Sequence, residues 1–242
     1  MTGDTSTDVS TEMSADMTTG MTARQMLTTT RAVRRRLDLE RPVPLSLVRQ
    51  CIDIAVQAPS GRNGQRWRWV VVDDPERKQG LADIWRRTYA GPRAPITEDP
   101  ALRRIMASSD HLAEVMHRVP VLVVPCLLDR PPVERGPHAL ADFYGSGLPA
   151  VWSFMLAARL HGLGTAMTTQ HLAKEEAAAD LLGIPHTVTQ LALIPVAFTI
   201  GDRFRPAPRR PVDEIIYRNS WRGRPGAPDR SARSAGSAPD GG

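Results

Sequence analysis

The sequence predicts a layered fold of helices packed on a small sheet, of either the α+β or the α/β class. Two observations support this prediction. Apolar residues at helical spacing alternate along the chain with short runs of valine, leucine and isoleucine. The hydrophobic fraction of 41% is ordinary for a protein that buries a core. Helices alternating with a few strands occur in both classes, and the pattern alone does not separate them.

The folded body is predicted to span residues 24–221 as one domain. Residues 1–23 are rich in Thr, Ser, Asp and Met and have no apolar period. Residues 222–242 consist largely of Arg, Gly, Pro, Ala and Ser. Both ends are therefore predicted to be disordered tails.

The helices are predicted from apolar spacing and from the residues that bound them. Val48, Cys51 and Ala55 recur at helical spacing after Pro44, and Pro59 ends this helix. Helices are likewise predicted at residues 44–58, 76–88, 101–117 and 148–161, with a polar helix at 23–30 and a proline-rich loop at 89–100. The last helix is the most apolar, and such a helix belongs in the core or at a subunit interface.

Strands are predicted at residues 69–72, 121–128 and 191–200, where short apolar runs are bounded by turn residues. Pro125 and Pro195 stand inside the second and third runs. Because proline cannot donate a hydrogen bond to a neighbouring strand, each of these strands is expected to have a bulge or to lie at an edge of the sheet.

Charge, cysteines and histidines limit the class of function. The net charge of +5 and the pI near 9.8 leave a nucleic-acid-binding protein open, but no known DNA- or RNA-binding motif accompanies the arginines. The histidines show no metal-ligand spacing, so no metal is expected.

Cys51 and Cys126 lie in apolar contexts and are expected to be buried free thiols. The chain has no secretory signal and no run of about 18 apolar residues, so a cytoplasmic protein without a membrane span is expected.

Residues 58–69 form a loop of small and amide residues between an apolar helix and an apolar strand. The amides of Asn63 and Gln65 can each donate and accept, which suits the edge of a heterocycle that carries both kinds of group. Ser60 and Gly61 are small and allow the backbone to come close. This loop is predicted to contact a ligand.

Two further segments are candidates for ligand binding. Arg31 and Arg34 follow the first helix, and a guanidinium binds phosphate through a planar fork of donors, although a solvated arginine run is the alternative. The segment from Gly162 to Gln170 follows the apolar helix, which Gly162 is placed to cap. A dinucleotide-binding fingerprint fails here, because Met167 occupies the third glycine position and no strand precedes the segment.

The loop at 58–69 resembles that of the FMN-dependent nitroreductase family, which reads A-P-S-x-x-N-x-Q-P-W before a strand. Ser60, Asn63, Gln65 and Trp67 keep this register, whereas Arg66 replaces the usual proline. Three more segments occur in the family's order, so the resemblance covers almost all of residues 24–221.

The resemblance assigns roles to these segments. The family's R-S-x-R holds the FMN phosphate and the polar edge of the flavin, and here Ala32 replaces the serine. The segment after the glycines passes under the flavin near N5, and the arginine of a closing R-x-P-x-x-x-x-h…W signature reaches the phosphate. The cofactor-binding residues that the resemblance implies are Arg31, Ala32, Arg34, Ser60, Gly61, Asn63, Gln65, Thr168, Thr169, Gln170 and Arg209.

The resemblance also decides for the α+β class. It implies a three-layer fold with a central, mostly antiparallel sheet flanked by helices, in an intertwined homodimer with FMN in the interface. One subunit would grip the phosphate while the other offers the amide loop. NAD(P)H would deliver hydride to flavin N5, and a small electron-poor acceptor such as a nitroaromatic or a quinone would then take its place in a ping-pong reaction. No side chain is therefore expected to be catalytic in itself.

Two alternatives stay open. Relatives with this fold dehalogenate iodotyrosine, break down reduced flavin or oxidise peptide-derived rings, and segments 85–104 and 129–147 match no lid that would decide. The other alternative is a non-enzymatic protein that sequesters flavin or associates with nucleic acid, for which salt-sensitive DNA binding without NAD(P)H turnover would be diagnostic. Arg62, Arg66 and Arg68 either suit the extra phosphate of NADPH or face solvent.

Overall fold

The computed structural model describes residues 20–89 and 98–221. These residues belong to two compact units that divide between Phe204 and Arg205. The predicted domain at 24–221 spans both units. The predicted tails at 1–23 and 222–242 lie outside the described residues, apart from residues 20–23, and so does most of the predicted loop at 89–100.

Seven α-helices form in the described residues. They are α1 (Ala23–Thr29), α2 (Leu45–Ala55), α3 (Pro75–Tyr89), α4 (Pro100–Val115), α5 (Pro137–Gly145), α6 (Leu148–Leu160) and α7 (Glu175–Leu182). Five of them were predicted, with ends that differ by a few residues. Helices α5 and α7, of nine and eight residues, were not predicted.

The sheet confirms the α+β class. Its strands are β1 (Trp67–Val72), β2 (Val121–Leu127), β3 (Leu163–Thr165), β4 (Thr189–Gln190) and β5 (Ile194–Phe198). They lie in the order β1-β2-β5-β3, with β4 paired to β2, and every pairing is antiparallel. Antiparallel strands with helices on the faces distinguish this fold from a parallel α/β sheet.

Both strand prolines lie where a neighbouring ladder is interrupted. The expectation of an edge position is wrong for β2 and β5, since each has partners on both sides. Pro125 stands between the part of β2 that pairs with β5 and the part that pairs with β4, and its carbonyl accepts from Leu191 N–H at 2.8 Å. Pro195 lies between the β3 pairing and the isolated bridge of Thr168 with Leu193. The missing N–H of each proline thus coincides with a break in one of the two ladders of its strand.

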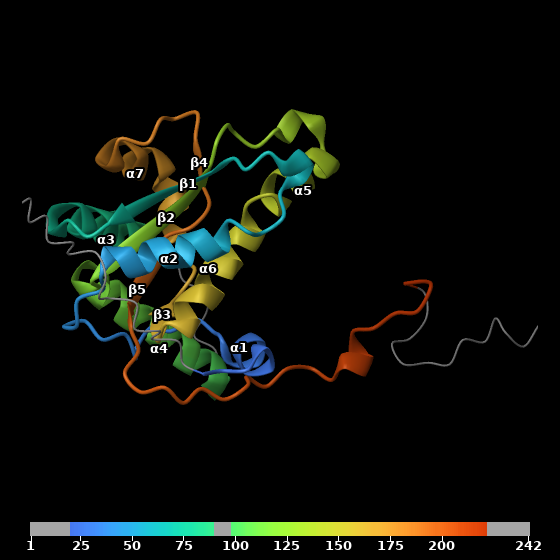
Figure 1. Ribbon diagram of the computed structural model, residues 1–242, viewed down its shortest axis with the longest axis horizontal. Helices are drawn as coiled ribbons and strands as arrows, with labels where there is room; N and C mark the ends of the chain where they lie inside the picture. Colours follow the sequence, from blue (N-terminus) through green and yellow to red (C-terminus); the bar gives the residue numbers. More distant parts are fainter. Residues whose placement is uncertain (1–19, 90–97, 222–242) are drawn as a thin grey trace, which may run out of the picture. The chain divides into compact units, whose positions relative to one another are not determined.

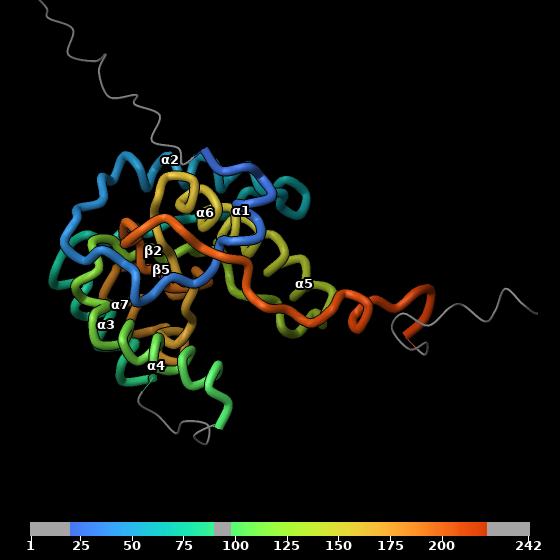
Figure 2. Tube along the Cα trace, turned by 90° about the horizontal axis from the view of Figure 1, so that it is seen from below, coloured from blue at the N-terminus to red at the C-terminus, as the bar shows by residue number. Residues whose placement is uncertain are grey.

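Each face of the sheet carries its own core. Along β2, Leu122, Val124 and Cys126 point to one face, and the residues between them point to the other, as the pleat requires. Helices α3, α4 and α7 pack on the first face, and α2 and α6 on the second. Figure 1 shows α2 lying across the sheet, and Figure 2 shows α2 and α6 on the side opposite α3, α4 and α7. The result is the three-layer arrangement that was expected.

The described part of the smaller unit, residues 205–221, contains one turn of 3-10 helix, η5 (Val212–Glu214). The rings of Tyr217 and Trp221 stack within it, with centroids 4.3 Å apart. Arg209 is exposed here, and its Nη1 donates to the Pro208 carbonyl at 3.0 Å. Its predicted contact with phosphate stays a prediction.

Candidate functional site

The amide loop between α2 and β1 has an unusual backbone. Arg62, Asn63 and Gln65 have φ angles of 54°, 52° and 46°, in the left-handed region that L-residues seldom adopt. Residues 61–66 are all exposed, so burial does not force this conformation. Gln65 N–H donates to Ser60 Oγ at 3.2 Å, which closes the loop. Strain of this kind, on an exposed loop, is typical of a binding site.

The two amides of the loop bond to each other. Gln65 Nε2 donates to Asn63 Oδ1 at 2.9 Å. Within the described residues, no hydrogen bond engages Asn63 Nδ2 or Gln65 Oε1. The loop therefore presents one amide donor and one amide acceptor close together and oriented by their mutual bond.

Helix α5 anchors the loop at Gly61. Gly61 N–H donates to Ser146 Oγ at 2.8 Å, and the indole N–H of Trp67 donates to the Ser146 carbonyl at 2.6 Å. A Cβ on Gly61 would overlap the carboxylate of Asp142. The close approach that Gly61 permits is therefore to α5 of the same chain, whereas the sequence suggested close approach to a ligand. Ser146 was missed, because it lies far along the chain and carries no motif.

The arginine segment and the glycine segment are joined by a backbone hydrogen bond. Val33 N–H donates to the Thr165 carbonyl of β3 at 2.8 Å, and Val33 is buried. Gly164 makes room for this contact, since a Cβ there would lie 2.8 Å from Thr199 Cγ2 and 3.0 Å from Val33 Cβ. Two segments predicted separately thus form one surface beside β3. Gly162 has a φ of 73° and caps α6 as predicted.

This surface contains a pocket lined by cations. Its walls include Arg31, Ala32, Arg34, Arg35, Arg36 and Ser108, and no carboxylate lines it among the described residues. Arg31 Nε is buried without a hydrogen-bond partner in that part of the chain. Arg34 Nη1 donates to Ser108 Oγ at 3.3 Å, and burial lowers the pKa of the Arg34 guanidinium below its usual range. Such a pocket favours an anion.

The three predicted residues after the glycines differ in their exposure. Thr168 is buried, and its hydroxyl donates to the Leu193 carbonyl at 2.8 Å and accepts from Trp85 Nε1 at 3.2 Å. Its side chain therefore holds the segment in place and has no free group for a ligand. Thr169 and Gln170 are exposed and remain candidates for ligand contact.

The amide loop and the arginine segment lie at opposite corners of the sheet. The loop leads into Trp67, which pairs with Leu127 at the end of β2. The arginine segment bonds to Thr165, which pairs through Val196 with Val121 at the start of β2. Standard strand geometry separates the corners by about 20 Å along the strands and about 14 Å across them.

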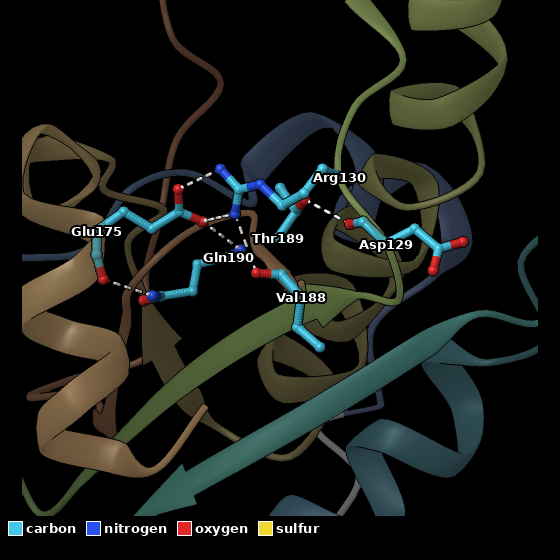
Figure 3. Close-up of polar contacts among 6 residues, drawn as sticks. All are labelled: Asp129, Arg130, Glu175, Val188, Thr189 and Gln190. Carbon is cyan, nitrogen blue, oxygen red and sulfur yellow. Dashed lines mark hydrogen bonds and ion pairs between the residues drawn. The ribbon is translucent and has the colours of Figure 1, made fainter. Parts of the chain in front are cut away.

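A polar network that the sequence did not reveal lies at the start of α7, five residues after Gln170. Arg130 Nη1 and Nη2 donate to the two Glu175 carboxylate oxygens, and Arg130 also donates to the Val188 carbonyl at 3.0 Å (Figure 3). Glu175 further accepts from Gln190 N–H at 3.0 Å. Burial would raise the pKa of Glu175, but the hydrogen bonds from Arg130 and Gln190 lower it below its usual range. The network fixes the start of α7 to the ends of β2 and β4.

His171 stands between Gln170 and this network. It is fully buried, and neither ring nitrogen has a hydrogen-bond partner within residues 20–89 and 98–221. Burial lowers the pKa of His171 to about 4, against the opposing effect of the Glu175 charge. The ring is therefore neutral at neutral pH.

In the described part of the chain, no group of three or more His, Cys, Asp or Glu side chains is arranged to hold a metal ion. None of the described helices has the length and apolar character needed to cross a membrane.

Comparison with known proteins identifies the family to which the chain belongs. A family model described as the nitroreductase family matches residues 27–201. The chain belongs to the nitroreductase family, and its three-layer α+β fold is the one shared by the solved structures that it matches.

Two relatives and one solved structure illustrate the likeness. An NADH dehydrogenase of Thermus thermophilus is 39% identical over 80 residues, which are 31% of this chain and 37% of the relative. An iodotyrosine deiodinase of Drosophila melanogaster is 27% identical over 161 residues, 64% of this chain and 54% of the relative. The chain thus matches about half the length of these relatives or less. A crystal structure of oxidized iodotyrosine deiodinase bound to FMN and 3-iodo-L-tyrosine has a TM-score of 0.61 and 21% identity, covering 81% of this chain and 98% of that one.

Proposed function

We propose that this protein is an FMN-dependent oxidoreductase that takes electrons from NAD(P)H and passes them to small electron-poor acceptors such as nitroaromatics or quinones. The observation that carries the proposal is the amide pair, in which Asn63 and Gln65 bond to each other and keep one donor and one acceptor free. The polar edge of a flavin ring presents the complementary groups. The FMN-bound deiodinase structure and the relative named NADH dehydrogenase support the choice of cofactor and donor.

The cation-lined pocket supports a cofactor that carries phosphate. A phosphate oxygen would satisfy the buried N–H of Arg31 Nε, which otherwise lacks a partner among the described residues. The absence of a lining carboxylate in that part of the chain leaves the guanidiniums of Arg31 and Arg34 available. Because Ala32 has no hydroxyl, one ordinary hydrogen bond to the cofactor is lost, which is worth about 1 kcal/mol. Each charge-assisted hydrogen bond from an arginine contributes more, roughly 1.5–3 kcal/mol. The residues present therefore fit FMN.

Bound FMN would supply the two-electron hydride chemistry. The chain's own residues bind and orient the reactants. Arg34 would hold a positive charge beside the polar edge of bound FMN, where it would favour the reduced form. Thr169 and Gln170 would lie near the reacting part of the ring, on a segment that the buried Thr168 holds in place. No side chain is required as an acid or a base, because protons can come from water.

We infer that the working unit is a homodimer. The phosphate pocket and the amide loop lie at opposite corners of the sheet, so a single FMN molecule cannot contact both sites of one chain. Leu148 and Trp152 on α6 support an interface, since each is 42% exposed although the helix is strongly apolar. Light scattering should give the mass of two chains. A monomer that binds one FMN tightly would refute the dimer.

The first test is the visible absorption spectrum of the purified protein, with the released flavin identified. A flavin spectrum that bleaches with anaerobic NADPH or NADH, and returns with a nitroaromatic or a quinone, is expected. Arg34→Glu should lower flavin occupancy sharply, whereas Arg87→Glu, an exposed charge reversal on α3, should not. A colourless protein that refuses added FMN would overturn the proposal and favour a basic surface protein.

Reductive dehalogenation is the second candidate, favoured by the match to an iodotyrosine deiodinase over 64% of this chain. In that reaction two electrons and a proton replace a carbon–halogen bond by a carbon–hydrogen bond and release halide. Iodide release from 3-iodotyrosine by the reduced protein, faster than nitroaromatic reduction, would select this candidate.

We also propose a cytoplasmic location. Cys51 and Cys126 are both free, which suits a reducing compartment. Burial raises the pKa of each thiol to about 12, so neither thiol is reactive at neutral pH.

A further inference from the structure

A second pocket borders the amide loop on the side of α5. Its volume is about 460 Å³, within the range of cavities that hold small organic ligands. Three elements bring arginines to it. Arg62 comes from the loop, Arg66 from the residue before β1, and Arg135 from η3 (Val133–Arg135), the 3-10 turn before α5.

Two of these arginines have no acidic partner. Arg66 forms an ion pair with Asp129. No ion pair or hydrogen bond engages the side chains of Arg62 and Arg135 within residues 20–89 and 98–221. Asp142 is the one carboxylate that lines the pocket in that part of the chain, and it lies against Gly61. The pocket therefore offers two unpaired guanidiniums to an anion.

The pocket also has an apolar wall, beside the polar side chains of His138 and Ser146. Leu127, at the end of β2, Leu128 and Pro132 contribute aliphatic surface, and Phe143 of α5 contributes an aromatic ring. A flat heterocycle packs well on such a wall. An apolar wall with a guanidinium rim matches an aromatic base that carries a phosphate.

We propose that this pocket binds the adenosine 2′-phosphate end of NADPH and makes NADPH the preferred electron donor. The inference rests on the proposed function, and it adds the identity of the donor. The pocket and the amide pair share one loop, so a donor whose nicotinamide reaches the flavin can place its adenosine end beside that loop. The 2′-phosphate is a monoester with close to two negative charges, and two guanidiniums can pair with it. NADH lacks this phosphate.

Arg68 provides a matched control. The sequence grouped it with Arg62 and Arg66 as a possible contact for the NADPH phosphate. Arg68 points elsewhere, since it does not line the pocket and its Nη1 donates to the Trp67 carbonyl at 2.6 Å. Of the three arginines that the sequence grouped, Arg62 and Arg66 thus line the pocket, whereas Arg68 lies on β1.

The test compares donors in the FMN-loaded enzyme. Wild-type protein should have a higher kcat/KM for NADPH than for NADH. In the double variant R62Q/R135Q, the ratio of the two values should fall about 10- to 100-fold, the loss expected for two solvent-exposed charged contacts, each weaker than a buried one. R68Q should keep the wild-type ratio. Equal use of both donors by the wild type, or an equal loss with both donors in the double variant, would overturn the inference.

A binding measurement separates this inference from the proposed function. Calorimetric titration with adenosine 2′,5′-bisphosphate should show binding that R62Q/R135Q loses and R68Q keeps, and 5′-AMP should bind more weakly to the wild type. This readout needs no electron transfer. A protein without flavin would therefore refute the proposed function, whereas a bisphosphate that binds all three proteins equally would refute the pocket assignment alone.

Discussion

The guanidinium of Arg130 meets the carboxylate of Glu175 through two hydrogen bonds, at 2.8 and 2.7 Å (Figure 3). This fork-to-fork pair joins residues that are 45 positions apart in the chain. It ties the start of α7, five residues after Gln170, to the segment that follows β2. The pair thus anchors the chain beyond the segment that we assign to the surroundings of flavin N5.

Replacing Glu175 by Gln should destabilise the fold by about 2 kcal/mol, because the charge-assisted bonds to Arg130 are lost. Burial opposes ionisation of Glu175, but its hydrogen bonds prevail and its folded pKa lies below the ordinary 4.5. A lowered carboxylate pKa gives stability that is present above about pH 4.5 and is lost as the pH falls through the folded value. Urea denaturation at pH 7 and pH 4 should show this loss in the wild type and a smaller one in Glu175→Gln. The exposed neighbour Glu176, changed to Gln, is the control.

Because His171 is buried, the free energy of unfolding should fall as the pH falls from about 6.5 to about 4. Its folded pKa is lowered to about 4 from an ordinary 6.5, so in this window the unfolded chain binds a proton that the folded protein does not. Stability therefore falls as the pH falls, by on the order of 3 kcal/mol across the window. The free energy of unfolding of His171→Gln should change less over this range than that of the wild type. An identical slope in the two proteins would contradict the assignment, and His138→Gln, at an exposed site, serves as the reference.

Gly164→Ala should weaken FMN binding as well as the fold. The added methyl would lie 2.8 Å from Thr199 Cγ2 and 3.0 Å from Val33 Cβ, so the arginine segment must shift. Overpacking of this kind costs about 1–3 kcal/mol. Thermal unfolding and FMN titration should both report the change. Gly145→Ala meets no atom within 4 Å and should leave both measurements near the wild-type values.

Asn63→Asp tests the amide pair without changing the size of the side chain. An aspartate can still accept from Gln65, but it replaces the free Nδ2 donor by a negatively charged oxygen. The dissociation constant for FMN should rise about 10- to 100-fold, the loss expected when a polar contact becomes repulsive. Fluorescence titration of the apoprotein measures this change. If Asn63→Asp binds FMN as tightly as Gln57→Glu, an exposed amide outside the loop, then Asn63 does not face the flavin.

Local spacing predicted the long helices and the strands β1, β2 and β5, but not how the strands pair. Helix α6 was placed within a residue of its observed end, because its apolar residues fill several turns. The pairing of Val70 with Val124 joins strands more than 50 positions apart, and no local period carries that information. Strand β3 was missed for a related reason, since three residues with a central Gly164 give no alternating pattern.

The candidate site was predicted residue by residue but not contact by contact. The free donor and acceptor of the Asn63 and Gln65 pair agree with the two-sided amides that the sequence suggested. Gly61 and Thr168 were expected to serve a ligand, yet Gly61 makes room for α5 and the Thr168 hydroxyl is used by Leu193. Which partner satisfies a small or polar residue depends on the tertiary neighbours, and those come from distant parts of the chain.

The separation of the two corners of the sheet has a genetic consequence. In the proposed dimer, the arginine segment of one chain binds the phosphate of each FMN, and the amide loop of the other chain contacts the flavin ring. A chain defective in Arg34 and a chain defective in Asn63 would each form inactive dimers alone. Mixed in one dimer, they would gather both defects at one flavin and leave the second flavin with an intact arginine segment and an intact loop. Two alleles that each encode an inactive protein would then, when expressed together, give mixed dimers with up to half the activity of a normal dimer.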